Sequence, residues 1–560
     1  MLSRFSRSRL AIAVLLSSAA TELQAEVPSD IPAAILLAQD VALPGGEPAI
    51  IAEDSPLSDE APLSEIAEIH NGPIASSASP ACSFPSDAGS RQTTAAEIQK
   101  KREAAASKAA QAYKGVFYDN DFSYLRDPWY DGFYPGEGLK LLPMPRGGEI
   151  DLGGELRLRY HSEHNIRGQG LTGRDDDFLL TRVRLFSNYR INDYFRFYGE
   201  YLYAESGGET FASRPIEVNR GEAQNLFLDA HLISEQDHSL TARAGRQELI
   251  YGNQRLVSPL DWANTRRTFD GYKLMYSGPN WNVDGFFVNP VDRAVATQGT
   301  NRWDGADTQT LFYGVYGTRK DLDLGQFDTY YLGLDYERAG ASVHTLGSRL
   351  AGSYDWLLYE FEAGVQFGDN ADGTRHDAGF FTAGFGKKLD LNLVGKSWAP
   401  TIWTWYDYAS GEDDFAQAGR FGDGFDHLFP LAHKYNGFMD LFGRRNLHDL
   451  NAQFITPIFG ERVSLLLWYH YFLLDNLTTP YSVTMVPFNT VAPAADRELG
   501  HELDVLFTIN LNPRNSMLVG YSYFHAGDYY DETSGGLAGN NGIPSLDDAH
   551  FFYLQYQLQF

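Results

Sequence analysis

Arginines occupy alternate positions in two stretches of this 560-residue chain: Arg157 and Arg159 in the first, Arg182 and Arg184 in the second. The planar guanidinium group donates two parallel hydrogen bonds to a carboxylate, so arginine is well suited to recognise acidic ligands. Side chains at positions i and i+2 of a β-strand lie on the same face. If both stretches are strands, each pair faces one way and predicts a surface that binds carboxylates.

Two further segments combine basic and aromatic residues densely. Residues 243–273 include Asp-Trp-Ala-Asn-Thr-Arg-Arg-Thr-Phe-Asp, and residues 427–446 include His-Lys-Tyr-Asn and Gly-Arg-Arg-Asn. A passive surface loop explains this composition poorly. We therefore predict that the first segment folds into a lumen and narrows it with Arg246, Arg255, Arg266 and Arg267. The second segment contributes Lys434, Arg444 and Arg445.

The segments that would position these residues alternate apolar and polar side chains from Asp151 to the terminal Phe560. Period-two alternation indicates strands with one apolar face, as in a soluble sandwich or a membrane barrel. Many segments have about ten residues or more, the length that a tilted strand needs to cross hydrocarbon. The terminal aromatic, with apolar residues at alternate positions before it, resembles the C-terminal signal of bacterial outer-membrane proteins. We therefore predict an all-β fold, a transmembrane antiparallel β-barrel.

The barrel is predicted to contain about eighteen strands, an even number as is usual for such proteins. Connectors after odd-numbered strands are mostly long and face outside, whereas connectors after even-numbered strands are short periplasmic turns. Both ends of the barrel then lie on the periplasmic side; the ninth connector, near 338–341, is short and breaks the pattern. The predicted strands are 152–161, 178–191, 194–205, 223–233, 239–249, 269–277, 281–288, 309–319, 328–337, 342–353, 355–367, 377–389, 399–409, 447–456, 461–473, 499–511, 515–526 and 549–560.

A barrel of this size leaves a water-filled lumen, and strand parity decides which side chains face it. One side of the lumen is then mostly basic and the other mostly acidic. Such a wall fits either the transverse electric field of a diffusion porin or a surface that binds carboxylates along the pore. About half of the arginines are expected to form only structural ion pairs across strands. The inward basic residues, from early strands, are Arg157, Arg159, Arg182, Arg184, Arg190, Arg196, Arg243 and Lys273. The inward acids, from later strands, are Asp335, Glu337, Glu360, Glu362, Asp407, Glu502 and Asp504.

The N-terminal quarter predicts export. Residues 1–25 read as a signal peptide, with a basic start followed by the apolar run Leu10–Ala20. Residues 26–92 are predicted to be an acidic, disordered periplasmic linker, because they hold little apolar area. Eleven acids and no Lys or Arg lie between Glu26 and Ser90, so part of the net charge of −28 arises outside the barrel. Residues 93–150 predict a short helix and an aromatic, Gly-rich lead-in at the periplasmic mouth.

Cysteine and acidic residues offer no metal chemistry. Cys82 is the only cysteine, so neither an intramolecular disulfide nor a thiolate metal cluster is possible. The aspartates between residues 116 and 142 do not match the spacing of an EF-hand. We expect neither a metal nor another cofactor.

Five motifs resemble the alginate export family of outer-membrane porins, and the resemblance covers about 150–560. It implies an eighteen-stranded barrel with an electropositive constriction that conducts a polyuronate. In that light, the candidates for carboxylate contacts are Arg182, Arg184, Arg246, Arg266 and Arg267. The motifs are Phe178-Leu-Leu-Thr-Arg-Val-Arg-Leu, Gly245-Arg-Gln-Glu-Leu, Asp261-Trp-Ala-Asn-Thr-Arg-Arg-Thr-Phe-Asp-Gly, Leu428-Phe-Pro and Gly437-Phe-Met-Asp-Leu.

The leading hypothesis is a bacterial outer-membrane channel for an acidic polysaccharide such as alginate, in either direction. The alternatives are a general or small-anion diffusion porin, an outer-membrane enzyme, and an adhesin acting through its acidic loops. His161, His231 and His470 face inward, but no Ser/His/acid spacing supports an enzyme. Expected partners are membrane lipid and lipopolysaccharide, the barrel assembly machinery at Phe560, and periplasmic proteins at 26–150, but not nucleic acid.

Overall fold

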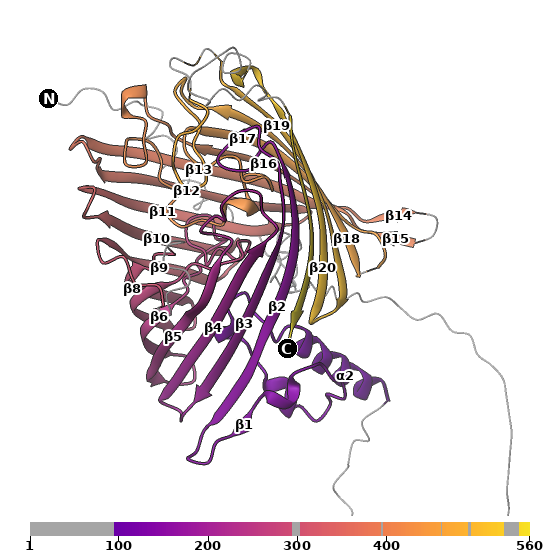
Figure 1. Ribbon diagram of the computed structural model, residues 1–560. Coiled ribbons are helices and arrows are strands. Elements are labelled where there is room, and N and C mark those ends of the chain that lie inside the picture. Colours follow the sequence, from indigo (N-terminus) through magenta and orange to yellow (C-terminus); the bar gives the residue numbers. More distant parts are fainter. Residues whose placement is uncertain are drawn as a thin grey trace, which may run out of the picture.

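The strands close into a single ring. The computed structural model describes residues 95–293, 303–393, 396–460, 462–490, 494, 496–530 and 548–560. Within them, a closed antiparallel barrel of eighteen strands forms as each barrel strand pairs with the next (Figure 1). Strand β2 completes the ring by pairing with β21, which sets Arg157 opposite Gln557. The predicted signal peptide, the acidic linker and Cys82 lie outside the described residues.

The eighteen predicted strands are confirmed, with bounds that differ by a few residues. They are β2 (Glu149–His164), β3 (Asp176–Arg190), β4 (Phe195–Gly207), β5 (Asn219–Ser234), β6 (Ser239–Gln247), β7 (Phe269–Ser277), β8 (Trp281–Pro290), β9 (Thr310–Leu322), β10 (Gly325–Tyr336), β11 (Ala341–Tyr354), β12 (Leu357–Asp369), β13 (Arg375–Lys388), β16 (Thr401–Ala409), β17 (Leu447–Pro457), β18 (Val463–Leu474), β19 (Glu498–Asn512), β20 (Asn515–Ala526) and β21 (Asp548–Gln559).

The barrel is apolar outside and charged inside. Along β2, Leu158 and Tyr160 are 36% and 38% exposed. Arg157 and Arg159, which alternate with them, are 0% and 1% exposed. This is the arrangement that a strand takes between lipid and lumen. It follows from the pleat, which sends alternate side chains to opposite faces. No helix among the described residues is long and apolar enough to cross a membrane.

Two short pairings lie outside the predicted set. Strand β1 (Leu142–Pro143) pairs with the start of β2, so that Leu142 faces Ile150. Strands β14 (Leu391–Leu393) and β15 (Lys396–Trp398) form a hairpin in the connector between β13 and β16. Figure 1 shows this hairpin projecting away from the barrel wall.

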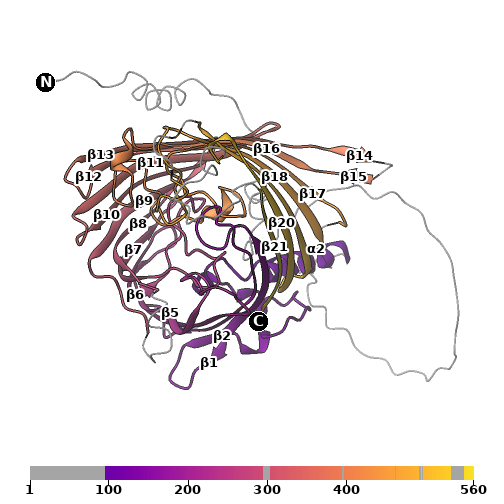
Figure 2. The same cartoon turned by 45° about the horizontal axis from the view of Figure 1, so that its top comes forward.

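The lead-in to the barrel packs into one end of it. Helix α2 (Ala95–Ala110) is followed by three 3₁₀ turns, η3 (Phe117–Asp119), η4 (Ser123–Arg126) and η5 (Glu137–Leu139). The C-terminus lies at the same end, where the ammonium group of Lys140 donates a hydrogen bond to the carbonyl of Phe560 at 3.3 Å (Figures 1 and 2). The aromatic residues around η3 and η4 enter the lumen, as described below.

Candidate functional site

Two connectors fold into the lumen and contact each other there. Residues 248–268, between β6 and β7, are called the first inner loop, and residues 410–446, between β16 and β17, the second inner loop. The backbone N–H of Ser258 donates to the carbonyl of Phe429 at 2.9 Å, and that of Phe429 donates to the carbonyl of Leu256 at 2.8 Å. In Figure 2 the orange second inner loop lies inside the ring of strands. The predicted inward folding of the 243–273 and 427–446 segments therefore matches the structure.

The first inner loop is held by the arginines of β2 and β3. Arg157 donates to the carbonyl of Asp261 at 2.8 Å, and Arg182 donates to the same carbonyl at 3.1 Å. The guanidinium of Arg159 lies 3.8 Å from the ring centre of Trp262, and His433 of the second inner loop stacks on the other face of that ring at 3.5 Å. These arginines face the lumen, as the alternation along the strands predicts. In this structure they contact the first inner loop and not a ligand.

The lumen beside β2 and β3 is filled, which corrects the prediction of a water-filled pore there. The side chains of Arg157, Arg159, Arg182, Arg184 and Arg266 are among the largest fully buried side chains of the described residues. Buried charges need hydrogen-bonding partners, and the inner loops supply backbone carbonyls and carboxylates for them. The inner loops therefore occupy the lumen beside this wall.

Ten of the thirteen predicted pore residues have a carboxylate oxygen within 4.0 Å, more than the expected half. The three others, Arg157, Arg159 and Arg267, donate to backbone carbonyls or to an amide in the described structure. Filling of the lumen explains the difference, because an unpaired buried cation is costly. The ten pairs are Arg182–Glu155, Arg184–Glu200, Arg196–Asp229, Arg243–Asp229, Arg246–Asp270, Arg255–Asp407, Arg266–Glu248, Lys273–Asp284, Arg444–Asp407 and Arg445–Asp426.

The acidic wall is bridged from across the lumen. Arg255 of the first inner loop lies 3.0 Å from Asp407 on β16, 3.5 Å from Glu362 and 3.6 Å from Glu360 on β12. Arg349 on β11 also pairs with Glu360, at 3.1 Å. Arg349 was missed as a site residue, although parity along the predicted 342–353 strand would have placed it inward.

The inward histidines all contact other side chains of the barrel. His470 on β18 is fully buried and lies 2.9 Å from Asp449, while Nδ1 of His231 lies 3.0 Å from the hydroxyl of Thr241. His161 is buried against Phe178, with ring centres 5.0 Å apart.

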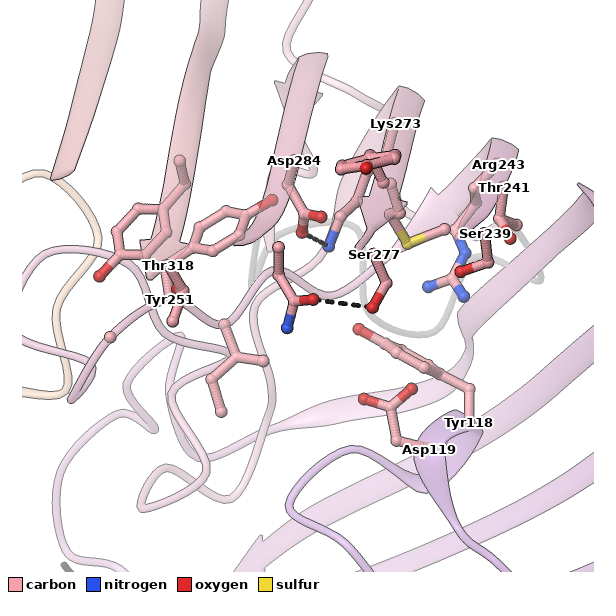
Figure 3. Close-up of a pocket in the computed structure, with 16 residues that line it drawn as sticks. Tyr118, Asp119, Ser239, Thr241, Arg243, Tyr251, Lys273, Ser277, Asp284 and Thr318 are labelled. Atoms are coloured by element: carbon pink, nitrogen blue, oxygen red, sulfur yellow. Dashed lines mark hydrogen bonds and ion pairs between the residues drawn. The ribbon is translucent and has the colours of Figure 1, made fainter. Parts of the chain in front are cut away.

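A cavity of about 390 Å³ remains between the lead-in and strands β6–β9. Figure 3 shows Tyr118 and Asp119 of the lead-in on one side, facing Lys273, Ser277 and Asp284 of the strands. Lys273 Nζ lies 2.7 Å from a carboxylate oxygen of Asp284. The cavity lies near the end where the lead-in and the C-terminus lie, so the lead-in fills only part of that mouth.

Comparisons with known proteins identify one family and a set of similar solved structures. Residues 149–542 match the alginate export family, and no curated protein matches the chain. Among solved structures, the chain is similar to OccAB1 of Acinetobacter baumannii, with 12% identity over 73% of this chain and 96% of that one and a TM-score of 0.48. It is also similar to a BenF-like porin of Pseudomonas fluorescens Pf-5, with 10% identity over 73% of this chain and 99% of that one and a TM-score of 0.47. A third similar structure is the outer-membrane protein OprD of Pseudomonas aeruginosa, with 11% identity over 73% of this chain and 94% of that one and a TM-score of 0.43.

Proposed function

The chain belongs to the alginate export family and is an outer-membrane channel, and on that premise we propose that it passes an acidic polysaccharide such as alginate along an arginine-lined wall. Family membership and the barrel fold point to a transport channel rather than an enzyme. A bacterial outer membrane is the proposed location. The wall formed by β2 and β3 is the proposed contact surface for the carboxylates of the cargo.

The observation that carries the proposal is an excess of positive charge on this wall. Arg157, Arg159, Arg182 and Arg184 share only two strand carboxylates, Glu155 and Glu200, and the remaining hydrogen bonds come largely from the inner loop. When the inner loop leaves, two guanidinium groups keep no carboxylate of their own. A polyuronate carries one carboxylate on each sugar and supplies the missing partners.

The proposal is tested by planar-bilayer recording of the purified full-length protein with polymannuronate or polyguluronate added. We expect the polymer, but not a neutral dextran of equal length, to block the current. Arg157→Gln with Arg159→Gln should raise the half-blocking concentration by at least about a hundredfold, because two charged hydrogen-bonding groups are lost and each contributes about 1.5–3 kcal/mol. The matched control is Arg220→Gln, since Arg220 pairs with Glu205 at an exposed site.

The alternative is a small-anion diffusion porin. Its signature in the same recordings is anion selectivity that neither polymer affects. That result, with wild-type protein and the double variant behaving alike, would refute passage of an acidic polysaccharide.

A further inference from the structure

Asp261 presents to the basic wall the same groups that an acidic sugar would present. Its carboxylate lies 3.0 Å from Nη2 of Arg182 and also contacts Arg266. Its backbone carbonyl accepts hydrogen bonds from Arg157 and Arg182. One residue thus offers a carboxylate and a neighbouring oxygen to three guanidinium groups, as a uronate does with its carboxylate and its ring or hydroxyl oxygens.

The residue after Asp261 adds an aromatic platform at the same place. Trp262 is held between the guanidinium of Arg159 and the ring of His433. The residue before it, Leu260, has φ +58°, a left-handed conformation that a leucine adopts only when contacts hold it. These contacts favour a loop that is fixed by its binding to the wall, not by its own preference.

We propose that Asp261 is an internal competitor that occupies a uronate-binding subsite made by Arg157 and Arg182 of the wall, while Arg266 of its own loop holds its carboxylate in place. The subsite takes a sugar carboxylate, and docking of the first inner loop excludes it. This inference rests on the proposed function. The accessibility of the groups fits the idea, since the side chain of Asp261 is 17% exposed while those of Arg182 and Arg266 are fully buried beneath it.

The test compares Asp261→Asn with wild type in the same block assay. Removing the competing charge should lower the half-blocking concentration of polyguluronate about tenfold, whereas Asp261→Glu should behave as wild type. The matched control is Glu205→Gln, which breaks an exposed pair elsewhere. Folding is checked by heat-modifiable mobility on gels.

The outcomes separate the two claims. Block of the wild-type channel with no gain in Asp261→Asn overturns the competitor while leaving the polysaccharide channel intact. Absence of block in every variant overturns the cargo as well, and with it the subsite.

A separate observation concerns residues 111–126, here called the N-terminal plug. They precede the family match at 149–542, yet they lie inside the lumen. Phe117, Tyr118 and Phe122 are 2%, 5% and 3% exposed, and they pack on lumen-facing aromatics. Those aromatics are Phe186, Tyr198 and Phe227.

The plug also binds arginines of the basic wall. The carbonyl of Gly115 accepts from Arg266 at 3.0 Å, and that of Tyr118 accepts from Arg196 at 2.9 Å. The guanidinium groups of Arg184 and Arg243 lie 3.8 Å and 4.5 Å from the ring centres of Phe117 and Tyr118. Residues that the sequence assigns to cargo are therefore covered by a segment of the chain that the matched family region does not include.

We infer that the N-terminal plug closes the mouth of the barrel at which the C-terminus lies and must leave it before cargo passes. Deleting residues 95–126 from the full-length protein should raise the conductance in potassium chloride several-fold, and this readout does not depend on which cargo is carried. A deletion of equal length, residues 30–61, is the control.

A second variant set guards against misfolding of the deletion. A bifunctional maleimide joining cysteines introduced by Phe117→Cys and Phe186→Cys, with Cys82→Ser, should hold the plug in place and keep conductance at its low value. Unchanged conductance of the folded deletion variant, or high conductance of the cross-linked protein, overturns the inference.

Discussion

Replacing Arg255 by glutamine should release the first inner loop from the acidic wall. Its guanidinium lies within 4.0 Å of Glu360, Glu362 and Asp407, whereas the neighbouring Asn253 reaches only Glu360, at 3.0 Å. Burial opposes its charge, but Asp407 and the two glutamates outweigh burial and raise the pKa of Arg255. The residue is therefore charged throughout the usable pH range, and glutamine removes that charge entirely.

The size of the effect follows from what remains. Removing one partner of a buried ion pair costs about 3–5 kcal/mol. Arg444 still lies 2.6 Å from Asp407 and Arg349 still lies 3.1 Å from Glu360, so the lower end applies. About 3 kcal/mol shifts the ratio of open to closed channel roughly a hundredfold.

Single-channel recording measures this ratio directly. Arg375→Gln, on the exposed start of β13, is the control for loss of one arginine. A folded Arg255→Gln channel with the open-to-closed ratio of wild type would show that the loop is not held by this contact.

Three further predictions concern other groups. Burial lowers the pKa of His427 to about 3, from 6.5 in an unfolded chain, despite Asp426 nearby, so the unfolded chain binds more protons between these values. Stability should fall as the pH drops from 6.5 toward 3, and His427→Gln should flatten this part of the curve of Tm against pH. Burial lowers the pKa of Lys140 from 10.5 to about 8, so stability should rise from pH 8 to 10.5, a rise that calorimetry should not find in Lys140→Met. Deletion of Phe560 removes two hydrogen bonds to Gly154 and should reduce the folded barrel recovered from membranes, whereas Phe560→Trp should not.

The strands and the facing of most of their residues could be predicted because both are local. The prediction that Asp335 and Glu337 face inward is wrong, since Asp328 and Tyr330, at the alternate positions of β10, contact Arg349 and Glu362 in the lumen. Alternation along β2 places Arg157 and Arg159 inward whatever their partners are, since the pleat alone decides the side. The same rule would have revealed Arg349. The long inner loops were also visible in the sequence, as segments whose charge and aromatic content made little sense at a surface.

The partners of these residues could not be predicted because they lie far away in the chain. Arg157 donates to a carbonyl 104 residues later, and Arg514 donates to the carbonyl of Ala109. Backbone acceptors leave no trace in sequence composition. The N-terminal plug lacks any periodicity because its aromatic residues pack irregularly against the wall, so only its density of aromatics hinted at a packed position near the mouth.

The lead-in contacts strands from both the start and the end of the barrel, and these contacts imply an order of assembly. Lys140 binds the carbonyl of the final residue, and Arg514 in the turn between β19 and β20 binds helix α2, while Phe117 packs on Phe186 of β3. These surfaces come together only when β21 has joined β2. The barrel must therefore be completed with its mouth unsealed, and the lead-in, which precedes the barrel in the chain, takes its place after it.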